Sequence, residues 1–234
     1  MKRVVISDIH IGSQYFKAVE LLRFLSEVEY DELILAGDII DFIKVPEFTD
    51  RALAIARTVD YSKTIIYVVG NHDTPLRGFI GKEFFGIKFV DKYEFEEGGR
   101  KFRVEHGDAY DHPILPNKIF MTLLSIVHDA IEKITEFDIT TWWSDYKIKK
   151  RKLRRIWDIL KKNKDVDVFI MGHSHHPEFV IWGLPDKDDI SIKTYVNTGD
   201  WVSHQTYVEI IDGIVRLKDY GAGNTDIGSD EFTD

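Results

Sequence analysis

The sequence predicts an α/β fold, and three patterns indicate it. Short apolar runs, among them Val4–Ile6, Leu33–Ala36 and Ile65–Val69, each end in a tight turn, as buried parallel strands do. Two segments with helical spacing of apolar residues, 15–29 and 46–59, separate these runs. Polar side chains follow the runs at the strand ends, where open α/β sheets place their chemistry. We therefore expect the chain to begin as a βαβαβ unit with right-handed crossovers.

The composition is that of a globular protein. With 234 residues, 44% of them apolar, the chain is long enough for one large α/β domain with an insertion. It has no cysteine, and no apolar run approaches the roughly 20 residues of a membrane helix. A strand is expected from Lys2 onward, in place of a signal peptide, so we expect a cytoplasmic protein. The net charge of −9 argues against binding to duplex nucleic acid.

The second half of the chain predicts more strands and one long helical block. Strands without intervening helices follow Phe84, which indicates an antiparallel portion or a second sheet. Residues 113–163 contain no glycine and have helical character, and we interpret them as an insertion that caps the site. Strands return from Val166 to Lys218. The expected organisation is a domain over 1–223 that includes the 113–163 cap, followed by a flexible acidic tail at 224–234.

Five of the predicted turns carry residues that bind metals. Carboxylates and imidazoles together suit Mn²⁺, Fe²⁺ or Zn²⁺, whereas a site this rich in histidine does not suit Ca²⁺. Two such ions about 3.5–4 Å apart can clamp a phosphate ester and activate a water, and a shared carboxylate holds them together. Asp38 is the natural shared carboxylate. The turns are Asp8-Ile9-His10, Gly37-Asp38-Ile39-Ile40-Asp41, Gly70-Asn71-His72-Asp73, His106-Gly107-Asp108 and Gly172-His173-Ser174-His175.

These five motifs, in this order, resemble the calcineurin-like metallophosphoesterase superfamily over residues 8 to 175. The resemblance implies a four-layer α/β/β/α sandwich with two divalent metal ions, Mn²⁺ in the first place and Fe or Zn as alternatives. It implies that one ion is held by Asp8, His10 and His175, that the other is held by Asn71, His106 and His173, and that Asp38 bridges them.

The resemblance also assigns catalytic residues. His72 would lie beside the substrate phosphate as a general acid or transition-state donor, oriented by Asp73, and Asp41 would support the site without binding metal. A metal-activated hydroxide would then hydrolyse a phosphodiester or diphosphate bond.

A narrower resemblance is to the UDP-2,3-diacylglucosamine pyrophosphatase branch, which acts on a nucleotide-sugar lipid. It rests on residues 172–177, on Asn197-Thr198-Gly199-Asp200-Trp201-Val202 and on the helical insertion. The chain departs from that branch at His72, where arginine is typical, and at 109–112, which replace a Cys-Thr-x-Asp continuation. The expected substrate is a small-molecule or lipid-linked phosphoester, contacted by His112, His176 and Asp200.

Two alternatives remain open at this stage. The first is a nuclease or cyclic-nucleotide phosphodiesterase, and the second is a metal-bearing interaction module. The presence of every expected ligand favours an enzyme over a module.

The segment 147–164 contains ten Lys or Arg residues. This basic helix is expected either to contact a diphosphate or an anionic membrane surface peripherally, or to be a solvated face with an apolar stripe.

Overall fold

The computed structural model describes residues 1–13, 15–42, 50–110, 154–186 and 189–231. The chain forms two compact units, residues 1–109 together with 163–234, and residues 110–162. Most of the predicted insertion at 113–163 lies outside the described residues, and of the part within them, 154–162 are helical. None of the described helices is long and apolar enough to cross a membrane.

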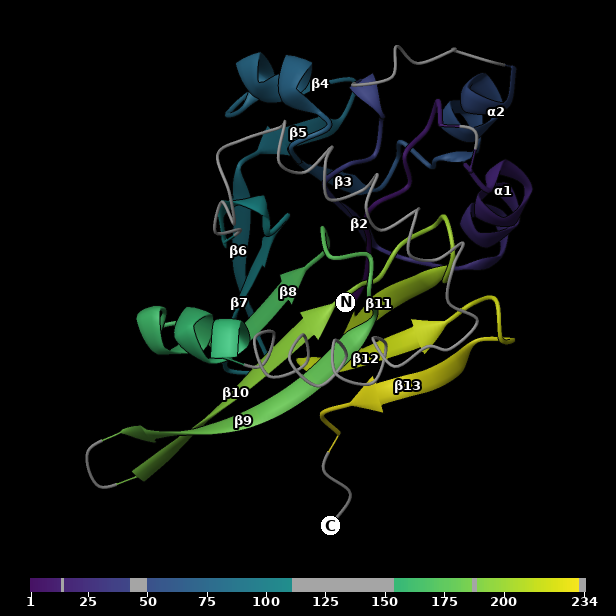
Figure 1. Ribbon diagram of the computed structural model, residues 1–234. Coiled ribbons are helices and arrows are strands. Elements are labelled where there is room, and N and C mark those ends of the chain that lie inside the picture. Colours follow the sequence, from purple (N-terminus) through teal and green to yellow (C-terminus); the bar gives the residue numbers. More distant parts are fainter. Residues whose placement is uncertain (14, 43–49, 111–153, 187–188, 232–234) are drawn as a thin grey trace, which may run out of the picture. The chain divides into compact units, whose positions relative to one another are not determined.

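The first unit contains an eight-stranded sheet in the order β13-β12-β11-β1-β2-β3-β5-β4 (Figure 1). Its centre is the predicted βαβαβ unit, in which four strands run parallel: β1 (Lys2–Ile6), β2 (Glu32–Ala36), β3 (Thr64–Val68) and β5 (Ile87–Val90). The helices between them are α1 (Ala18–Glu27) and α2 (Asp50–Thr58). Antiparallel strands complete both edges: β4 (Glu83–Phe84), β11 (Thr206–Ile211), β12 (Ile214–Asp219) and β13 (Thr225–Ser229).

A second, five-stranded sheet has the order β6-β7-β8-β10-β9. Here β7 and β8 are parallel although residues 106–167 separate them in sequence, and β8 is also parallel to β10. The strands are β6 (Lys92–Glu97), β7 (Arg100–Glu105), β8 (Val168–Met171), β9 (Glu178–Asp186) and β10 (Asp189–Asn197).

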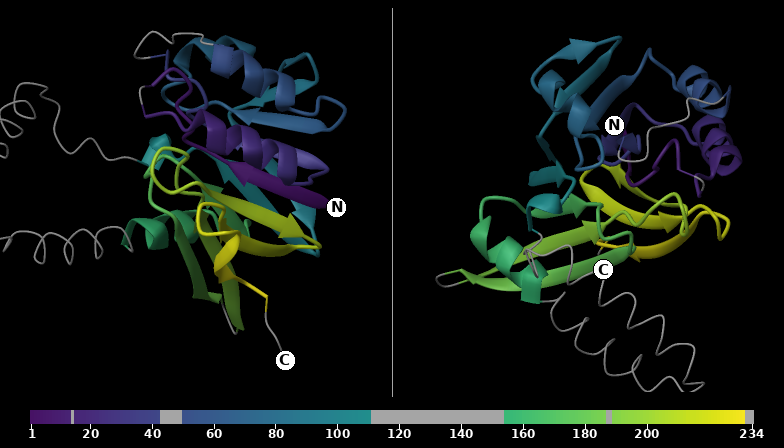
Figure 2. Two further views of the ribbon diagram at one scale, coloured as in Figure 1. Left: turned by 90° about the vertical axis from the view of Figure 1, so that its right-hand side faces the viewer. Right: turned by 45° about the horizontal axis from the view of Figure 1, so that its top comes forward.

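Two apolar cores explain why the parallel strands are apolar on both faces. Because successive strand residues point to opposite sides, Val4 joins the core under α1 and α2, whereas Val5 joins a second core with Val104 and Ile170 of the other sheet. Both helices therefore cover one face of the first sheet, and the second sheet covers the other (Figure 2). The predicted α/β class with two stacked sheets is confirmed.

Two details differ from the sequence-based expectations. The strand at 87–90 is β5 of the first sheet, so the second sheet begins only at β6. The predicted flexible tail is also wrong for Thr225–Ser229, which pair with β12 as β13. Directly after β13, the buried Asp230 carboxylate accepts hydrogen bonds from Arg100 at 2.6 Å and from the Val215 N–H at 2.8 Å. These contacts fix a segment whose composition suggests fraying.

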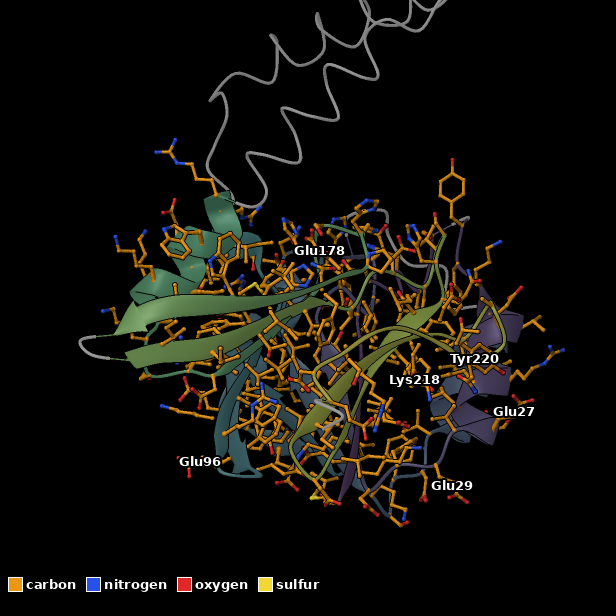
Figure 3. The ribbon with its side chains drawn as sticks, turned by 90° about the horizontal axis from the view of Figure 1, so that it is seen from below. Glu27, Glu29, Glu96, Glu178, Lys218 and Tyr220 are labelled. Carbon is orange, nitrogen blue, oxygen red and sulfur yellow. The ribbon has the colours of Figure 1, made fainter. Side chains whose placement is uncertain are left out.

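The end of β12 is also connected to α1. The Tyr220 hydroxyl, just beyond β12, donates a hydrogen bond of 2.7 Å to Glu27 Oε2 at the last residue of α1 (Figure 3). The Tyr220 ring packs edge-on against Phe24 of the same helix, with ring centroids 5.3 Å apart. The antiparallel edge of the sheet and the first helix are thus held together.

Candidate metal centre

The five predicted turns come together at the carboxyl ends of the strands. Backbone hydrogen bonds connect them: the N–H of Asp8 donates to Gly37 O at 3.0 Å, the N–H of His10 to Asp38 O at 3.0 Å, and the N–H of Gly172 to His106 O at 3.1 Å. The parallel pairing of β1, β2 and β3 brings the first three turns to one sheet edge. The second sheet supplies the other two from β7 and β8.

The backbone at this site is strained in a way that the sequence does not reveal. Positive φ angles are uncommon for residues other than glycine and cost free energy, so they persist only where surrounding contacts enforce them. Here five candidate ligands share a left-handed conformation: Asp8 (φ 51°), His10 (φ 52°), Asp38 (φ 55°), His173 (φ 65°) and His175 (φ 56°). These turns aim successive side chains at one point.

Glycine is required beside two of these turns because atoms approach very closely. A methyl group on Gly172 would overlap Ser7 Oγ and Asp8 Oδ2. A methyl group on Gly37, which has φ of 90°, would overlap the His106 ring. These two glycines therefore let the candidate ligand side chains approach each other.

The first ligand cluster consists of Asp8, His10 and His175, whose ligand atoms lie within 4.8 Å of one another. His175 Nε2 lies 3.3 Å from both His10 Nε2 and Asp8 Oδ1. Asp8 Oδ2 accepts hydrogen bonds from Ser7 Oγ and from the His173 N–H, whereas Oδ1 is buried and accepts none within the described residues. A buried carboxylate oxygen without a donor, facing two imidazole nitrogens, fits a divalent cation.

The second cluster consists of Asp38, His106 and His173, and Asn71 adjoins it. His106 Nδ1 lies 3.0 Å from Ala36 O, a contact that assigns a proton to Nδ1 and turns Nε2 toward the cluster. His106 Nε2 then faces Asn71 Oδ1 at 3.0 Å and Asp38 Oδ2 at 3.1 Å. With the proton on Nδ1, His106 Nε2 is an acceptor, as are Asn71 Oδ1 and Asp38 Oδ2. Three acceptors this close together require either a second proton on the His106 ring or a cation between them.

Charge and burial determine which of these groups hold protons. Burial lowers the pKa of His10 to about 4, although Asp38 partly opposes this, so the ring is neutral and able to bind metal at pH 7. Burial also disfavours charge on His106, but its contacts with Asp38 and Asp8 outweigh burial and raise the pKa to about 9. In the absence of metal, a proton on His106 therefore occupies the place where a cation would bind. Burial raises the pKa of Asp8, while contacts with His106 overcome burial and lower that of Asp38.

His72 adjoins both clusters. Its backbone N–H donates to Asp38 Oδ1 at 2.8 Å, and its ring packs edge-on against His10 with centroids 4.8 Å apart. Its Nδ1 lies 3.1 Å from Asp41 Oδ1, and its Nε2 lies 3.9 Å from Asp38 Oδ2. The half-buried ring is therefore positioned by Asp41 beside the Asp38 carboxylate.

Asp73 has a different place from the one expected. Its fully buried carboxylate accepts hydrogen bonds from the backbone N–H groups of Asp38 (2.7 Å), Ile40 (3.1 Å) and Gly70 (3.1 Å), and from the Tyr67 hydroxyl (2.8 Å). These bonds hold the Asp38 turn against β3. Among the described hydrogen bonds, the contact to the His72 ring comes from Asp41 and not from Asp73.

The three residues expected to contact the substrate are His112, His176 and Asp200. His112 lies outside the described residues. His176 is exposed, with its ring centroid 5.9 Å from that of His204. Asp200 is buried beside His175.

Sequence reasoning missed three supporting residues, Ser7, Tyr67 and Thr198. Ser7 Oγ contacts Asp8 Oδ2 and lies 2.5 Å from Thr198 Oγ1, while Tyr67 binds Asp73. Ser7 had a signal in the sequence because it adjoins Asp8, and Thr198 because it stands in the motif at 197–202, whereas Tyr67 acts across the fold and had none.

Comparisons with known proteins agree with this geometry. A family model described as calcineurin-like phosphoesterase matches residues 1–177. A UDP-2,3-diacylglucosamine hydrolase of Porphyromonas gingivalis is 24% identical over 244 residues, which cover 86% of this chain and 90% of that protein.

Two solved structures share the fold. The phosphoesterase Yfce of E. coli has a TM-score of 0.51 and 14% identity over 98% of each chain. Vacuolar Protein Sorting 29 of Cryptosporidium parvum has a TM-score of 0.51 and 14% identity, covering 100% of this chain and 98% of that one. The family match spans all five turns that carry the candidate ligands, and the chain belongs to the calcineurin-like phosphoesterase family.

Proposed function

We propose that this protein is a di-metal phosphoesterase that hydrolyses a phosphodiester or diphosphate bond. The observation that supports this most strongly is that Asp38 belongs to two ligand groups, one with His106 and His173 and one with His10 and His72. A carboxylate that lies between two groups of metal-binding side chains is the arrangement that holds two cations close together. Mn²⁺ is the proposed metal, because mixed imidazole and carboxylate ligands suit it, with Fe²⁺ and Zn²⁺ as alternatives.

Each group of residues at the site has a separate role in the proposed reaction. When bound, two divalent cations supply Lewis acidity toward the phosphate oxygens and an activated water as nucleophile. Asp8, His10 and His175 would hold one cation, Asn71, His106 and His173 the other, and Asp38 both. His72 is the proposed donor to the phosphate or the leaving oxygen, because Asp41 at 3.1 Å can keep its ring oriented. Asp73 acts at a distance, by holding the Asp38 turn in place.

The proposed substrate is a nucleotide-sugar diphosphate that carries a lipid, similar to UDP-2,3-diacylglucosamine. The hydrolase of that name in P. gingivalis aligns with most of this chain, which supports the proposal.

A cytoplasmic site of action with peripheral membrane contact through the basic helix is part of the same proposal. The described helix at 154–162 exposes Arg154, Lys161 and Lys162 on one side and buries Ile156 and Leu160. This amphipathic pattern is compatible with contact to an anionic surface.

A side-by-side hydrolysis assay tests the proposal. Mn²⁺-loaded protein is given UDP-2,3-diacylglucosamine or bis-p-nitrophenyl phosphate, with His72→Ala as the matched control. Rapid cleavage of the lipid that is lost in His72→Ala, while both metals stay bound, supports the full proposal. Cleavage of the generic diester alone would contradict the proposed lipid substrate but would still support phosphodiesterase activity. If metal-loaded protein hydrolyses neither compound, the proposal that it is a phosphoesterase is refuted.

A further inference from the structure

Asp200 occupies a buried position in the loop between β10 and β11. Only 2% of its surface is exposed. Its Oδ1 accepts hydrogen bonds from three backbone N–H groups of the same loop, those of Val202 (3.0 Å), Ser203 (2.5 Å) and His204 (3.1 Å). This oxygen closes the turn and fixes the direction of the carboxylate.

The second carboxylate oxygen points at a candidate metal ligand. Asp200 Oδ2 lies 3.4 Å from His175 Nδ1 and 3.2 Å from Nδ1 of the partly exposed His204. The opposite ring nitrogen of His175, Nε2, lies 3.3 Å from the unsatisfied Asp8 Oδ1. The His175 ring therefore lies between Asp200 and the first ligand cluster.

We propose that Asp200 is a positioning residue that receives the Nδ1–H of His175 and so presents Nε2 of that ring to a metal ion. A neutral imidazole can carry its proton on either nitrogen, and only the nitrogen without the proton can bind a cation. A fixed acceptor at Nδ1 selects the tautomer and holds the ring plane. The inference rests on the proposed metal centre and adds a residue to it.

The position of Asp200 argues against the direct substrate contact expected from the sequence. Both of its oxygens are already engaged inside the protein, and its side chain is almost completely covered. A substrate phosphate would also be repelled by this carboxylate. Its contacts with His175 and with the loop N–H groups, which outweigh burial, lower the pKa of Asp200 below its ordinary value and keep it charged.

Asp200→Asn is the test variant because it keeps Oδ1 as an acceptor and replaces Oδ2 by an NH₂ group. The asparagine Oδ1 can still accept the three backbone hydrogen bonds, so the loop is retained. Its NH₂ group donates and cannot accept the His175 Nδ1–H, so the favoured tautomer places the proton on Nε2. Loss of such a supporting carboxylate typically weakens metal binding 10–100-fold. The matched control is His204→Ala, which removes the other neighbour of Oδ2.

Metal binding is measured by calorimetric titration with Mn²⁺ and by elemental analysis of the loaded protein, with a thermal melt as the folding control. We expect wild type and His204→Ala to bind two ions, and Asp200→Asn to bind one of them about 10–100-fold more weakly with a nearly unchanged melt. Unchanged affinity for both ions in Asp200→Asn overturns the inference. Failure of the wild type to bind two ions overturns the di-metal proposal instead, so the two failures are distinguishable.

A measurement on the wild type covers the case in which the variant does not fold. In Zn²⁺-loaded, ¹⁵N-labelled protein, the nitrogen shifts of the His175 ring report which nitrogen carries the proton. We expect a protonated Nδ1 and a metal-bound Nε2. A protonated Nε2, or metal on Nδ1, overturns the role of Asp200.

Discussion

Replacing Asp73 by alanine should destabilise the metal-free protein by about 4 kcal/mol. The carboxylate is completely buried and accepts hydrogen bonds from four groups: the N–H groups of Asp38, Ile40 and Gly70, and the Tyr67 hydroxyl. Alanine supplies no acceptor, so these donors would stay buried without partners. At about 1 kcal/mol for each donor, the free energy of unfolding falls by about 4 kcal/mol.

The assay is urea denaturation with EDTA present, followed by circular dichroism. Tyr67→Phe is the matched control, because it removes one of the four hydrogen bonds and should cost only about 1 kcal/mol. If Asp73→Ala lowers the free energy of unfolding by less than 1 kcal/mol, the reasoning is refuted. A nearly unchanged stability with a large loss of turnover would instead support the expectation that Asp73 orients His72.

Three further predictions follow from the geometry. Gly172→Ala should lower the melting temperature and weaken metal binding, because its methyl group overlaps Ser7 and Asp8; an unchanged melt and unchanged affinity would contradict this. Metal affinity should rise with pH up to about 9, because His106, with its pKa near 9, must release a proton before a cation binds. Calorimetry in buffers of different ionisation heat detects that proton, and a pH-independent affinity would count against the site. Truncation after residue 223 should cost about 3 kcal/mol, since it removes β13 and the buried Asp230, whereas equal stability in urea would favour a loose tail.

The positions of the candidate ligands could be predicted because each depends on a local pattern. An apolar run such as Leu33–Ala36 specifies a buried strand, and the glycine after it specifies where the strand ends. Parallel pairing then brings the strand ends together without further information. For this reason Asp8, Asp38 and Asn71 could be placed at one edge from the sequence alone.

The supporting contacts could not be predicted because they depend on how the turns cross in space. Asp41 and Asp73 are both acidic residues next to ligand motifs, and nothing local indicates which of them reaches His72. The left-handed conformation at Asp38 decides the direction in which that turn leaves the sheet. In the resulting arrangement Asp41 contacts the His72 ring and Asp73 the backbone.

The ordered end of the chain could not be predicted from local sequence either. Residues 224–234 are rich in acidic and small polar side chains, which is typical of a mobile tail. The contact that orders this segment joins Asp230 to Arg100, far away in sequence. Such a pair becomes visible only once both sheets are in place.

Anomalous diffraction from crystals grown with Mn²⁺ tests the central claim most directly. The account predicts two peaks, one among Asp8, His10 and His175 and one among Asn71, His106 and His173, with Asp38 touching both. A single peak, no peak, or two ions that share no carboxylate would contradict it.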